Sequence, residues 1–169
     1  MNNLQAIRKE KDAFFASHWQ SPLTPEQKRD FKGLKYFPEN PALRMTVDVE
    51  EFEEKRVVPI QTSTGDYQEY VRYGQFTFQV EEQTARLTLY KADYGFFLPF
   101  ADSLAGIETY PAGRYLEPEP LGGNKFLVDF NLAYNPYCAY NENWSCPLTP
   151  AENRLEVPIR AGEKMFHPE

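Results

Sequence analysis

The chain has 169 residues, of which 41% are hydrophobic and 25% are charged, and its formal net charge is −7. This length fits one domain, residues 1–169, which is large enough to be stabilised by a hydrophobic core without disulfide bonds or a structural metal ion. The negative net charge argues against nucleic acid or a membrane as a partner. No apolar run is long enough to span a bilayer, and the first residues lack the apolar core of a signal peptide. We therefore expect a cytoplasmic protein.

The N-terminal segment, residues 1–33, is predicted to be helical. Its apolar residues recur at helical spacing and predict a helix over residues 3–18. These residues are Leu4, Ile7, Phe14 and Phe15. A second, short helix is expected at Thr24, which can cap it, with Pro25 at the first helical position and Gln27 completing a capping box.

Residues 42–165 are predicted to form a mainly β domain, because the hydrophobic period changes to two at the start of this segment. Short strands are expected at 43–49, 56–61, 67–73, 76–80 and around 87–89, with 94–100 either a strand or a buried loop. Pro59 places its strand at an edge or a bulge. Short turns join these strands, so we expect an antiparallel β meander that closes into a barrel or a sandwich, within an α+β chain.

Two later segments, 109–116 and 125–132, are predicted to pair as a hairpin. The connection between them, residues 117–124, contains two prolines and two glycines. Residues 133–152 carry repeated Asn and Pro and no hydrophobic period, which is typical of a loop. A last strand is expected over residues 154–160.

This half of the chain carries several motifs. They are Phe100-Ala101-Asp102, Thr109-Tyr110-Pro111-Ala112-Gly113-Arg114-Tyr115, Asp129-Phe130-Asn131-Leu132-Ala133-Tyr134-Asn135-Pro136-Tyr137-Cys138, Cys146-Pro147 and Ala161-Gly162-Glu163-Lys164. Together they resemble a bacterial and archaeal family catalogued as domain of unknown function 1684, over nearly the whole chain. The resemblance implies no established reaction.

The predicted hairpin suggests a site. If it forms, Tyr110 and Arg114 come from one strand and Asp129 and Asn131 from the other, so a phenol, a guanidinium, a carboxylate and an amide converge. Such a cluster suits a small polar ligand, with Arg114 facing a carboxylate or phosphate. The alternative is a structural ion pair between Arg114 and Asp129, with Asn131 fixing a loop. The candidate ligand-binding residues are Tyr110, Arg114, Asp129, Asn131, Tyr134 and Asn135.

The two cysteines, Cys138 and Cys146, are most simply free and half-buried, but a disulfide and a metal site stay open. Cys138 is a candidate nucleophile, yet a nucleophile needs an activating base. The histidines, His18 and His167, are near opposite ends of the sequence. A zinc site needs four ligands, or three and a water, and two thiols with two distant histidines would supply them only by coincidence of folding, so our first expectation is no metal site and no cofactor. Four aromatic residues of the loop either line a pocket or pack on the sheet: Tyr134, Tyr137, Tyr140 and Trp144.

Three functions remain open. The first is a small polar or anionic ligand-binding β domain, with its pocket under residues 133–150. The second is an enzyme of unassigned, hydrolase-like reaction, with Asp129 as acid or base, Arg114 holding an anionic group and Cys138 in reserve. The third is a protein-interaction module whose edge strand near Pro59 pairs with a partner or with a second copy, as a homodimer.

Overall fold

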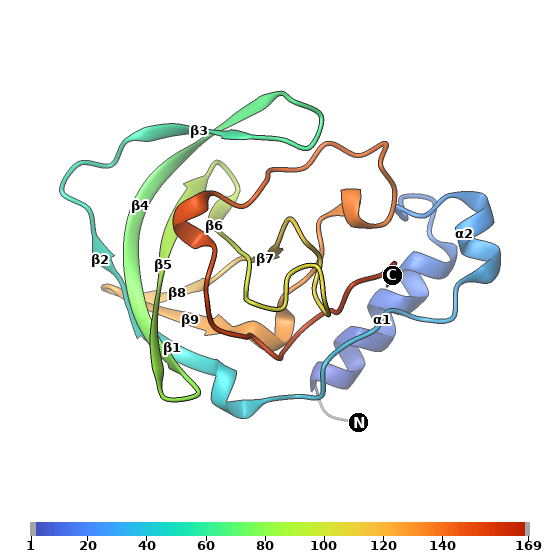
Figure 1. Cartoon of the computed structure of the whole chain (residues 1–169), viewed down its shortest axis with the longest axis horizontal. Helices are drawn as coiled ribbons and strands as arrows, with labels where there is room; N and C mark the ends of the chain where they lie inside the picture. The colour runs from blue at the N-terminus through green and yellow to red at the C-terminus, as the bar shows by residue number, and fades with distance from the viewer. Residues whose placement is uncertain (1–2, 168–169) are drawn as a thin grey trace.

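The computed structural model describes residues 3–167, and over these residues the chain is mainly antiparallel β with two α-helices at its start (Figure 1). The α-helices are α1 (Asn3–Ser17) and α2 (Pro25–Asp30). The strands are β1 (Arg44–Asp48), β2 (Glu50–Glu51), β3 (Val57–Gln61), β4 (Tyr67–Val80), β5 (Gln83–Ala92), β6 (Gly95–Phe100), β7 (Arg114–Leu116), β8 (Glu119–Gly122) and β9 (Lys125–Asp129). Four 3-10 turns are η1 (Pro41–Leu43), η2 (Phe130–Leu132), η3 (Tyr137–Ala139) and η4 (Ala151–Asn153).

The strands form two sheets in a sandwich-like arrangement. The larger sheet has the order β2-β4-β5-β6-β7, with β3 also paired to β4, and the smaller has the order β1-β9-β8. Every pairing between these strands is antiparallel, and β3 to β7 follow one another as a meander. The predicted meander is therefore confirmed, and so is the edge position of the Pro59 strand. Of the two predicted closures, the sandwich describes the arrangement and the barrel does not.

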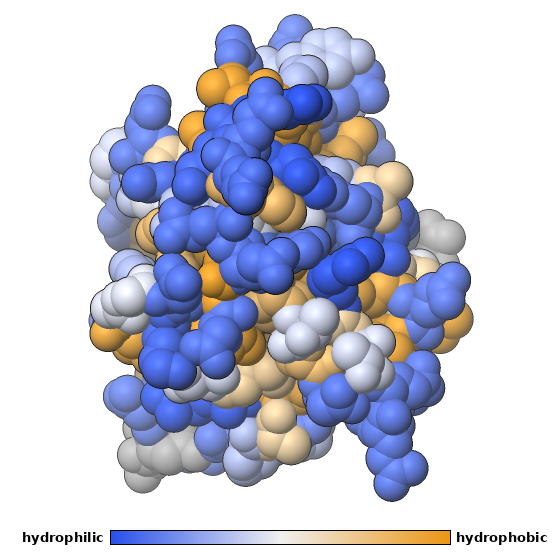
Figure 2. Space-filling view, turned by 90° about the vertical axis from the view of Figure 1, so that its left-hand side faces the viewer, coloured by the Kyte–Doolittle hydropathy of each residue, from blue (hydrophilic) through white to orange (hydrophobic). Residues whose placement is uncertain are grey.

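Alternating side chains build the core between the sheets. Phe76, Phe78 and Val80 of β4 are buried, whereas Thr77 and Gln79 between them are exposed. From the smaller sheet, the Phe126 ring lies 4.7 Å from the ring of Phe96, measured between centroids. The outer face over β2 and β4 is covered mostly by hydrophilic side chains (Figure 2), as the period of two requires.

The chain crosses from one sheet to the other at Val49. Its N–H donates to the carbonyl oxygen of Asn124 at 2.8 Å, and the next residue, Glu50, already pairs with β4. The crossing is close, because a Cβ on Gly74 would lie 2.7 Å from the carbonyl oxygen of Glu50. Residues 67–73 and 76–80, predicted as two strands, are one strand with a register shift between Arg72 and Gly74. That prediction is wrong because the glycine marks a bulge and a close approach, not a break.

The predicted hairpin between residues 109–116 and 125–132 is wrong. β7 pairs with β6, where Arg114 lies opposite Phe100, and β9 pairs with β1 and with β8. The two glycines after Leu121 have positive φ and close the short β8–β9 turn. The chain therefore changes sheets between Leu116 and Glu119, and β7 and β9 belong to different sheets.

Residues 154–160, predicted as a last strand, form no strand either. This segment instead runs beside the end of β6, where the N–H of Leu155 donates to Ala101 at 2.7 Å. Just before it, buried Asn153 replaces a strand partner: its amide bonds the N–H and carbonyl of Thr88 and the carbonyl of Pro99, each at 2.8 Å. β6 pairs with β5 only from Tyr90 onward, so Thr88 would otherwise face no partner on that side.

The two helices match their predictions, and residues 1–2 of the predicted N-terminal segment lie outside the described residues. Thr24 and Gln27 form the expected capping box. The helices pack beside the loop after β9 and the C-terminal segment (Figure 1): the rings of Phe15 and Tyr140 lie 4.9 Å apart, and Gln27 Nε2 donates to the Tyr140 carbonyl at 2.7 Å. Neither helix has the length and apolar content needed to cross a bilayer.

Candidate functional site

Arg114 is one of the most buried side chains of the described chain, with 1% of its surface exposed. It donates hydrogen bonds to the carbonyl oxygens of Ile159, Ala161 and Glu163. Its carboxylate neighbour is Asp102, whose Oδ2 lies 3.9 Å from Arg114 Nη2. Arg114 therefore fastens β7 to the C-terminal segment.

Asp129 lies elsewhere, at the end of β9. Its Oδ1 accepts from the N–H and the amide of Asn131, at 3.0 and 2.9 Å, and its Oδ2 lies 3.6 Å from Arg44. Asn131 in turn bonds both main-chain groups of Asn40. The expected convergence of Arg114 with Asp129 and Asn131 is wrong, and so is the ion pair between Arg114 and Asp129, because the hairpin that would join them does not form.

Asn135 also takes part in a buried network. Its N–H donates to Glu163 Oε2 at 3.1 Å and its amide to the Lys164 carbonyl at 3.0 Å. The Glu163 carboxylate, which is 1% exposed, additionally accepts from Lys11 and from the Tyr140 hydroxyl. These bonds tie the loop, α1 and the C-terminal segment together. A ligand-binding role for Asn135 stays a prediction.

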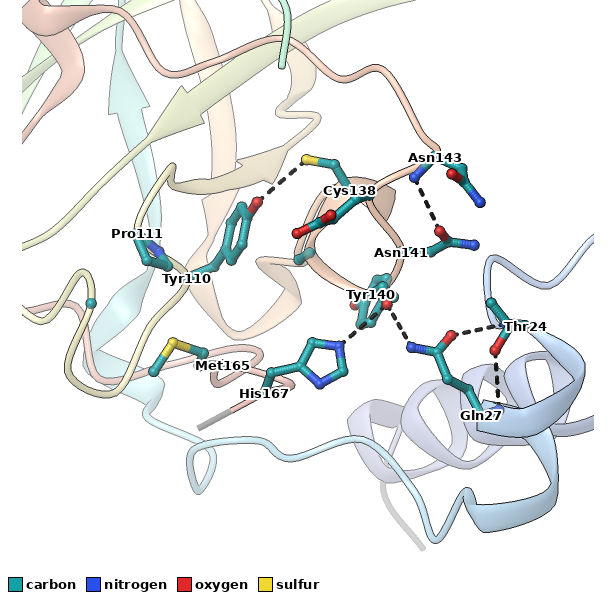
Figure 3. Close-up of a pocket in the computed structure, with 13 residues that line it drawn as sticks. Thr24, Gln27, Tyr110, Pro111, Cys138, Tyr140, Asn141, Asn143, Met165 and His167 are labelled. Atoms are coloured by element: carbon teal, nitrogen blue, oxygen red, sulfur yellow. Dashed lines mark hydrogen bonds between the residues drawn. The ribbon is translucent and has the colours of Figure 1, made fainter. Parts of the chain in front are cut away.

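Tyr110 lies in the wall of a hollow of about 650 Å³ beneath residues 138–143 (Figure 3). We call it the Cys138 hollow. Its walls come from four parts of the chain: the start of α2, the turn before β7, the loop around η3, and the C-terminal segment. They include Gln27, Tyr110, Cys138, Asn141, Met165 and His167.

The Cys138 thiol faces an unusual set of neighbours. The Tyr110 hydroxyl lies 3.5 Å from Cys138 Sγ, and the Cys138 N–H donates to Cys146 Sγ at 3.4 Å. Cys146 and the hydroxyls of Tyr110 and Ser63 can donate to the Cys138 thiolate, and these bonds lower the pKa of Cys138 to about 6 against the opposing effect of burial. The bond with Cys138 and burial both raise the pKa of Cys146. Both cysteines are free thiols in the structure.

The loop that carries Cys138 is fixed at several points. The Trp144 indole N–H donates to the Pro22 carbonyl at 3.2 Å, before α2. Ser63, after β3, exchanges main-chain and side-chain bonds with Cys146 and Trp144. The Leu148 N–H donates to Gln61 at 2.8 Å. These bonds hold the wall of the hollow on the ordered part of the fold.

His167 belongs to this wall, although it lies near the end of the sequence. Its Nε2 lies 3.3 Å from the Tyr140 carbonyl oxygen. Only the tertiary fold brings it to the same hollow as Cys138, and no local pattern indicates it. Over residues 3–167, no group of three or more His, Cys, Asp and Glu side chains could hold a metal ion.

The aromatic residues of the loop separate between two hollows. Tyr140 lines the Cys138 hollow, whereas Tyr134, Tyr137 and Trp144 line a second hollow of about 440 Å³. The Tyr134 hydroxyl donates to Glu117 Oε2 at 2.6 Å. Of the candidate ligand contacts, Tyr110 borders the Cys138 hollow and Tyr134 borders the second one. Asp129 and Tyr134 also line a smaller hollow of about 190 Å³, which neither Arg114 nor Asn131 lines.

Comparison with known proteins gives a family and a similar structure. The family model described as "Protein of unknown function (DUF1684)" matches residues 29–164. A solution NMR structure of the uncharacterized protein from gene locus rrnAC0354 of Haloarcula marismortui has 39% sequence identity and a TM-score of 0.71, covering 95% of this chain and 91% of that one. No curated protein matches this chain. The match over most of its length shows that the chain belongs to the DUF1684 family.

Proposed function

We propose that this chain binds a small polar ligand in the Cys138 hollow, with the Cys138 thiolate in contact with the ligand. The observation that carries the proposal is the position of this thiol. It is half-buried in the wall of a hollow and lies 3.5 Å from the Tyr110 hydroxyl. If the Cys138 thiol served only to pack the core, it would have no reason to line a hollow or to contact the Tyr110 hydroxyl.

The size and lining of the hollow support a small polar ligand. Its volume of about 650 Å³ lies within the roughly 300–1,000 Å³ that is usual for such sites. Apolar surface comes from Pro111 and Met165, and polar groups come from Asn141, Asn143 and His167. This mixture matches sites in which apolar walls bury a ligand and a few polar groups orient it.

A second candidate is an enzyme with Cys138 as nucleophile. With a pKa of about 6, this thiol is largely ionised at neutral pH and needs no separate base. In a hydrolase-like reaction, the sulfur would bond to an acyl carbon, the leaving group would depart with the bonding electrons, and water would then hydrolyse the thioester. Asp129, the first candidate acid or base, is absent from the residues that line this hollow.

The interaction-module alternative rests on the position of β3. This strand pairs with β4 on one side and lies at the edge of the sheet. Pairing of that edge with a partner or a second copy stays a prediction, which size measurement over a range of concentrations would test. The Cys138 hollow offers more specific chemistry, so we favour ligand binding.

The binding test uses the intact chain and two variants. Native mass spectra of gently purified protein are compared for wild type, Cys138→Ser and Asn143→Trp. Asn143 is exposed and lines the hollow, so a tryptophan there obstructs the hollow and leaves the thiol intact. We expect a retained small-molecule mass in wild type that Asn143→Trp loses and Cys138→Ser weakens.

If nothing is retained, saturation-transfer NMR with a library of polar fragments gives the same comparison. The proposal would be refuted if every bound fragment bound wild type and both variants equally, or if no fragment bound wild type. Turnover of p-nitrophenyl acetate separates the candidates. Repeated turnover that Cys138→Ser abolishes indicates an enzyme, and a single equivalent of p-nitrophenolate indicates a reactive thiol without catalysis.

A further inference from the structure

The second hollow lies on the other side of the loop and is mainly aromatic. We call it the aromatic hollow; its rings come from β4, from the turn before β6, from β6 and β7, and from the loop. They include Tyr70, Tyr94, Phe97, Tyr115, Tyr134 and Trp144. It is a separate site from the Cys138 hollow, and nothing below depends on the function proposed for that hollow.

The rings are packed into one continuous wall. Phe97 stacks on Tyr70 with centroids 5.1 Å apart, and its edge contact with Tyr115 is 4.8 Å. Tyr115 meets Tyr134 at 5.8 Å with the ring planes nearly perpendicular. Contacts of this kind hold the rings in place before any ligand binds, which lowers the entropic cost of binding.

Three of the tyrosine hydroxyls already have acceptors within the protein. Tyr70 donates to Gln68, Tyr115 to the Pro147 carbonyl, and Tyr134 to Glu117. Tyr70, Phe97 and Tyr115 are almost fully buried and form the back of the wall, so the ring surface open to a ligand comes mainly from Tyr94, Tyr134 and Trp144. Such π surface is electron-rich and attracts cations. A ligand group that forms no hydrogen bonds therefore loses little binding free energy in contact with these rings.

Glu117 supplies a negative charge beside these rings. The residue is exposed, and one carboxylate oxygen accepts from Tyr134 at 2.6 Å. Among residues 3–167, no lysine, arginine or histidine forms an ion pair with it. The hollow thus combines aromatic surface with a carboxylate that forms no ion pair within the described part of the chain.

The geometry points to a binding site for a small quaternary ammonium cation, one with a trimethylammonium group, in the aromatic hollow. Such a cation is attracted by ring faces and by Glu117, and its methyl groups need no hydrogen-bond acceptors. The volume of about 440 Å³ is within the usual range for small-molecule sites.

The test uses Trp144, which lines the hollow, as a fluorescent reporter. Trp19 is the other tryptophan and is 81% exposed, so Trp19→Phe removes it with little effect on the fold. The full chain with Trp19→Phe is titrated with choline, with tetramethylammonium chloride and with 3,3-dimethylbutan-1-ol, the uncharged analogue of choline. We expect saturable changes with both cations and none with the alcohol.

Two variants then locate the site. Glu117→Gln keeps the shape and removes the charge, and we expect choline binding to weaken about tenfold. Tyr94→Ala should weaken it by a smaller factor, of about threefold to fivefold. Tyr67→Ala is the control, because Tyr67 has nearly the same exposure, 64% against 67% for Tyr94, and does not line the hollow.

Three results would overturn the inference. The first is equal binding of the uncharged alcohol, which would make the hollow merely apolar. The second is cation binding that neither Glu117→Gln nor Tyr94→Ala changes, which would put the ligand elsewhere. The third is no saturable response at roughly 10 mM cation, about tenfold above a weak millimolar Kd.

Discussion

Arg114 and Asp102 hold the main chain of the same residue, Ile159. Arg114 Nη2 donates to the Ile159 carbonyl oxygen at 2.9 Å, and Asp102 Oδ2 accepts from its N–H at 2.7 Å. The two side chains lie 3.9 Å apart, and each is 1% exposed. Burial lowers the pKa of Arg114 to about 10, against the opposing effect of Asp102 and Glu163. The charged pair is therefore part of the core and replaces the strand pairing that residues 154–160 do not make.

Replacing Arg114 by Met should destabilise the fold by about 3–5 kcal/mol. The substitution leaves the Asp102 charge and three main-chain carbonyls without their buried partner. Urea unfolding measures the loss. Arg160→Met is the matched control, because Arg160 pairs with Glu81 at 3.2 Å on the surface, where such pairs contribute at most about 1 kcal/mol. Similar losses for the two variants would show that the buried pair adds nothing.

Asn153→Ala should also be strongly destabilising, although it removes only an amide. Three main-chain groups lose their partner: the N–H and carbonyl of Thr88 and the carbonyl of Pro99. At about 1–3 kcal/mol for each unsatisfied group, we expect a loss of at least about 3 kcal/mol in urea unfolding. Asn143→Ala is the exposed control and should change stability little. A loss below about 1 kcal/mol would mean that water replaces the amide.

The low pKa of Cys138 predicts how its reactivity varies with pH. The alkylation rate with iodoacetamide, followed by peptide mass mapping, should rise with a midpoint near pH 6, where the pKa lies. Cys146→Ala should move the midpoint to higher pH, because the bond with Cys146 is the largest cause of the shift. Tyr110→Phe should move it by less. A wild-type midpoint near 9, the ordinary value for a cysteine, would contradict the geometry of the thiol pair.

The same shift has a consequence for stability. The pKa of Cys138 is lower in the folded chain than the ordinary value near 9, so its thiolate stabilises the fold fully above pH 9 and not below pH 6. The pKa of Cys146 is raised in the folded chain, so its ionisation lowers the free energy of unfolding only above pH 9. The free energy of unfolding of wild type relative to Cys138→Ala should therefore increase between pH 6 and pH 9. A difference that stays constant over this range would contradict the shift.

The elements that the sequence predicts well are those that local patterns specify. The capping box at Thr24 sets the start of α2, and Pro59 is excluded from the middle of a sheet because it cannot donate. The alternation along β1 and β4 follows from one buried face. Each of these features depends on residues only a few positions apart.

Pairing between distant segments is where prediction from sequence fails. The glycines at 122 and 123 do mark a turn, but it closes the β8–β9 hairpin and does not join β7 to β9. A two-residue change of sheets at Pro118 has no distinct local pattern. When β7 pairs with β6, Arg114 lies opposite Phe100. Asp102 follows Phe100 by only two residues, so this pairing alone indicates Asp102 as the partner of Arg114.

The candidate site was predictable only in part, for the same reason. Tyr110 and Cys138 are both recognisable as chemically capable residues, but they are 28 positions apart and meet only through the fold. His167 and Glu117 carry no local signal, because a single polar residue near a chain end or a turn is usually solvated. The aromatic residues of the loop suggested a pocket, and the division between two hollows depends on which face of the loop each one occupies.

Gly113 tests how tightly the loop is held against the sheet. Its φ is +103°, and a Cβ there would lie 2.6 Å from the carbonyl oxygen of Phe100 and closer still to Thr149 Oγ1. Gly65 is a matched control, with a φ of +91° but nothing within 4 Å of its Cβ position. Gly65→Ala should cost about 1–2 kcal/mol from backbone strain alone. Gly113→Ala should cost about 1–3 kcal/mol more, because the methyl group meets main chain that cannot move without breaking the β6–β7 pairing. Equal losses in urea unfolding would mean that the segment around Thr149 moves aside, and that the loop is held against the sheet less tightly than the structure indicates.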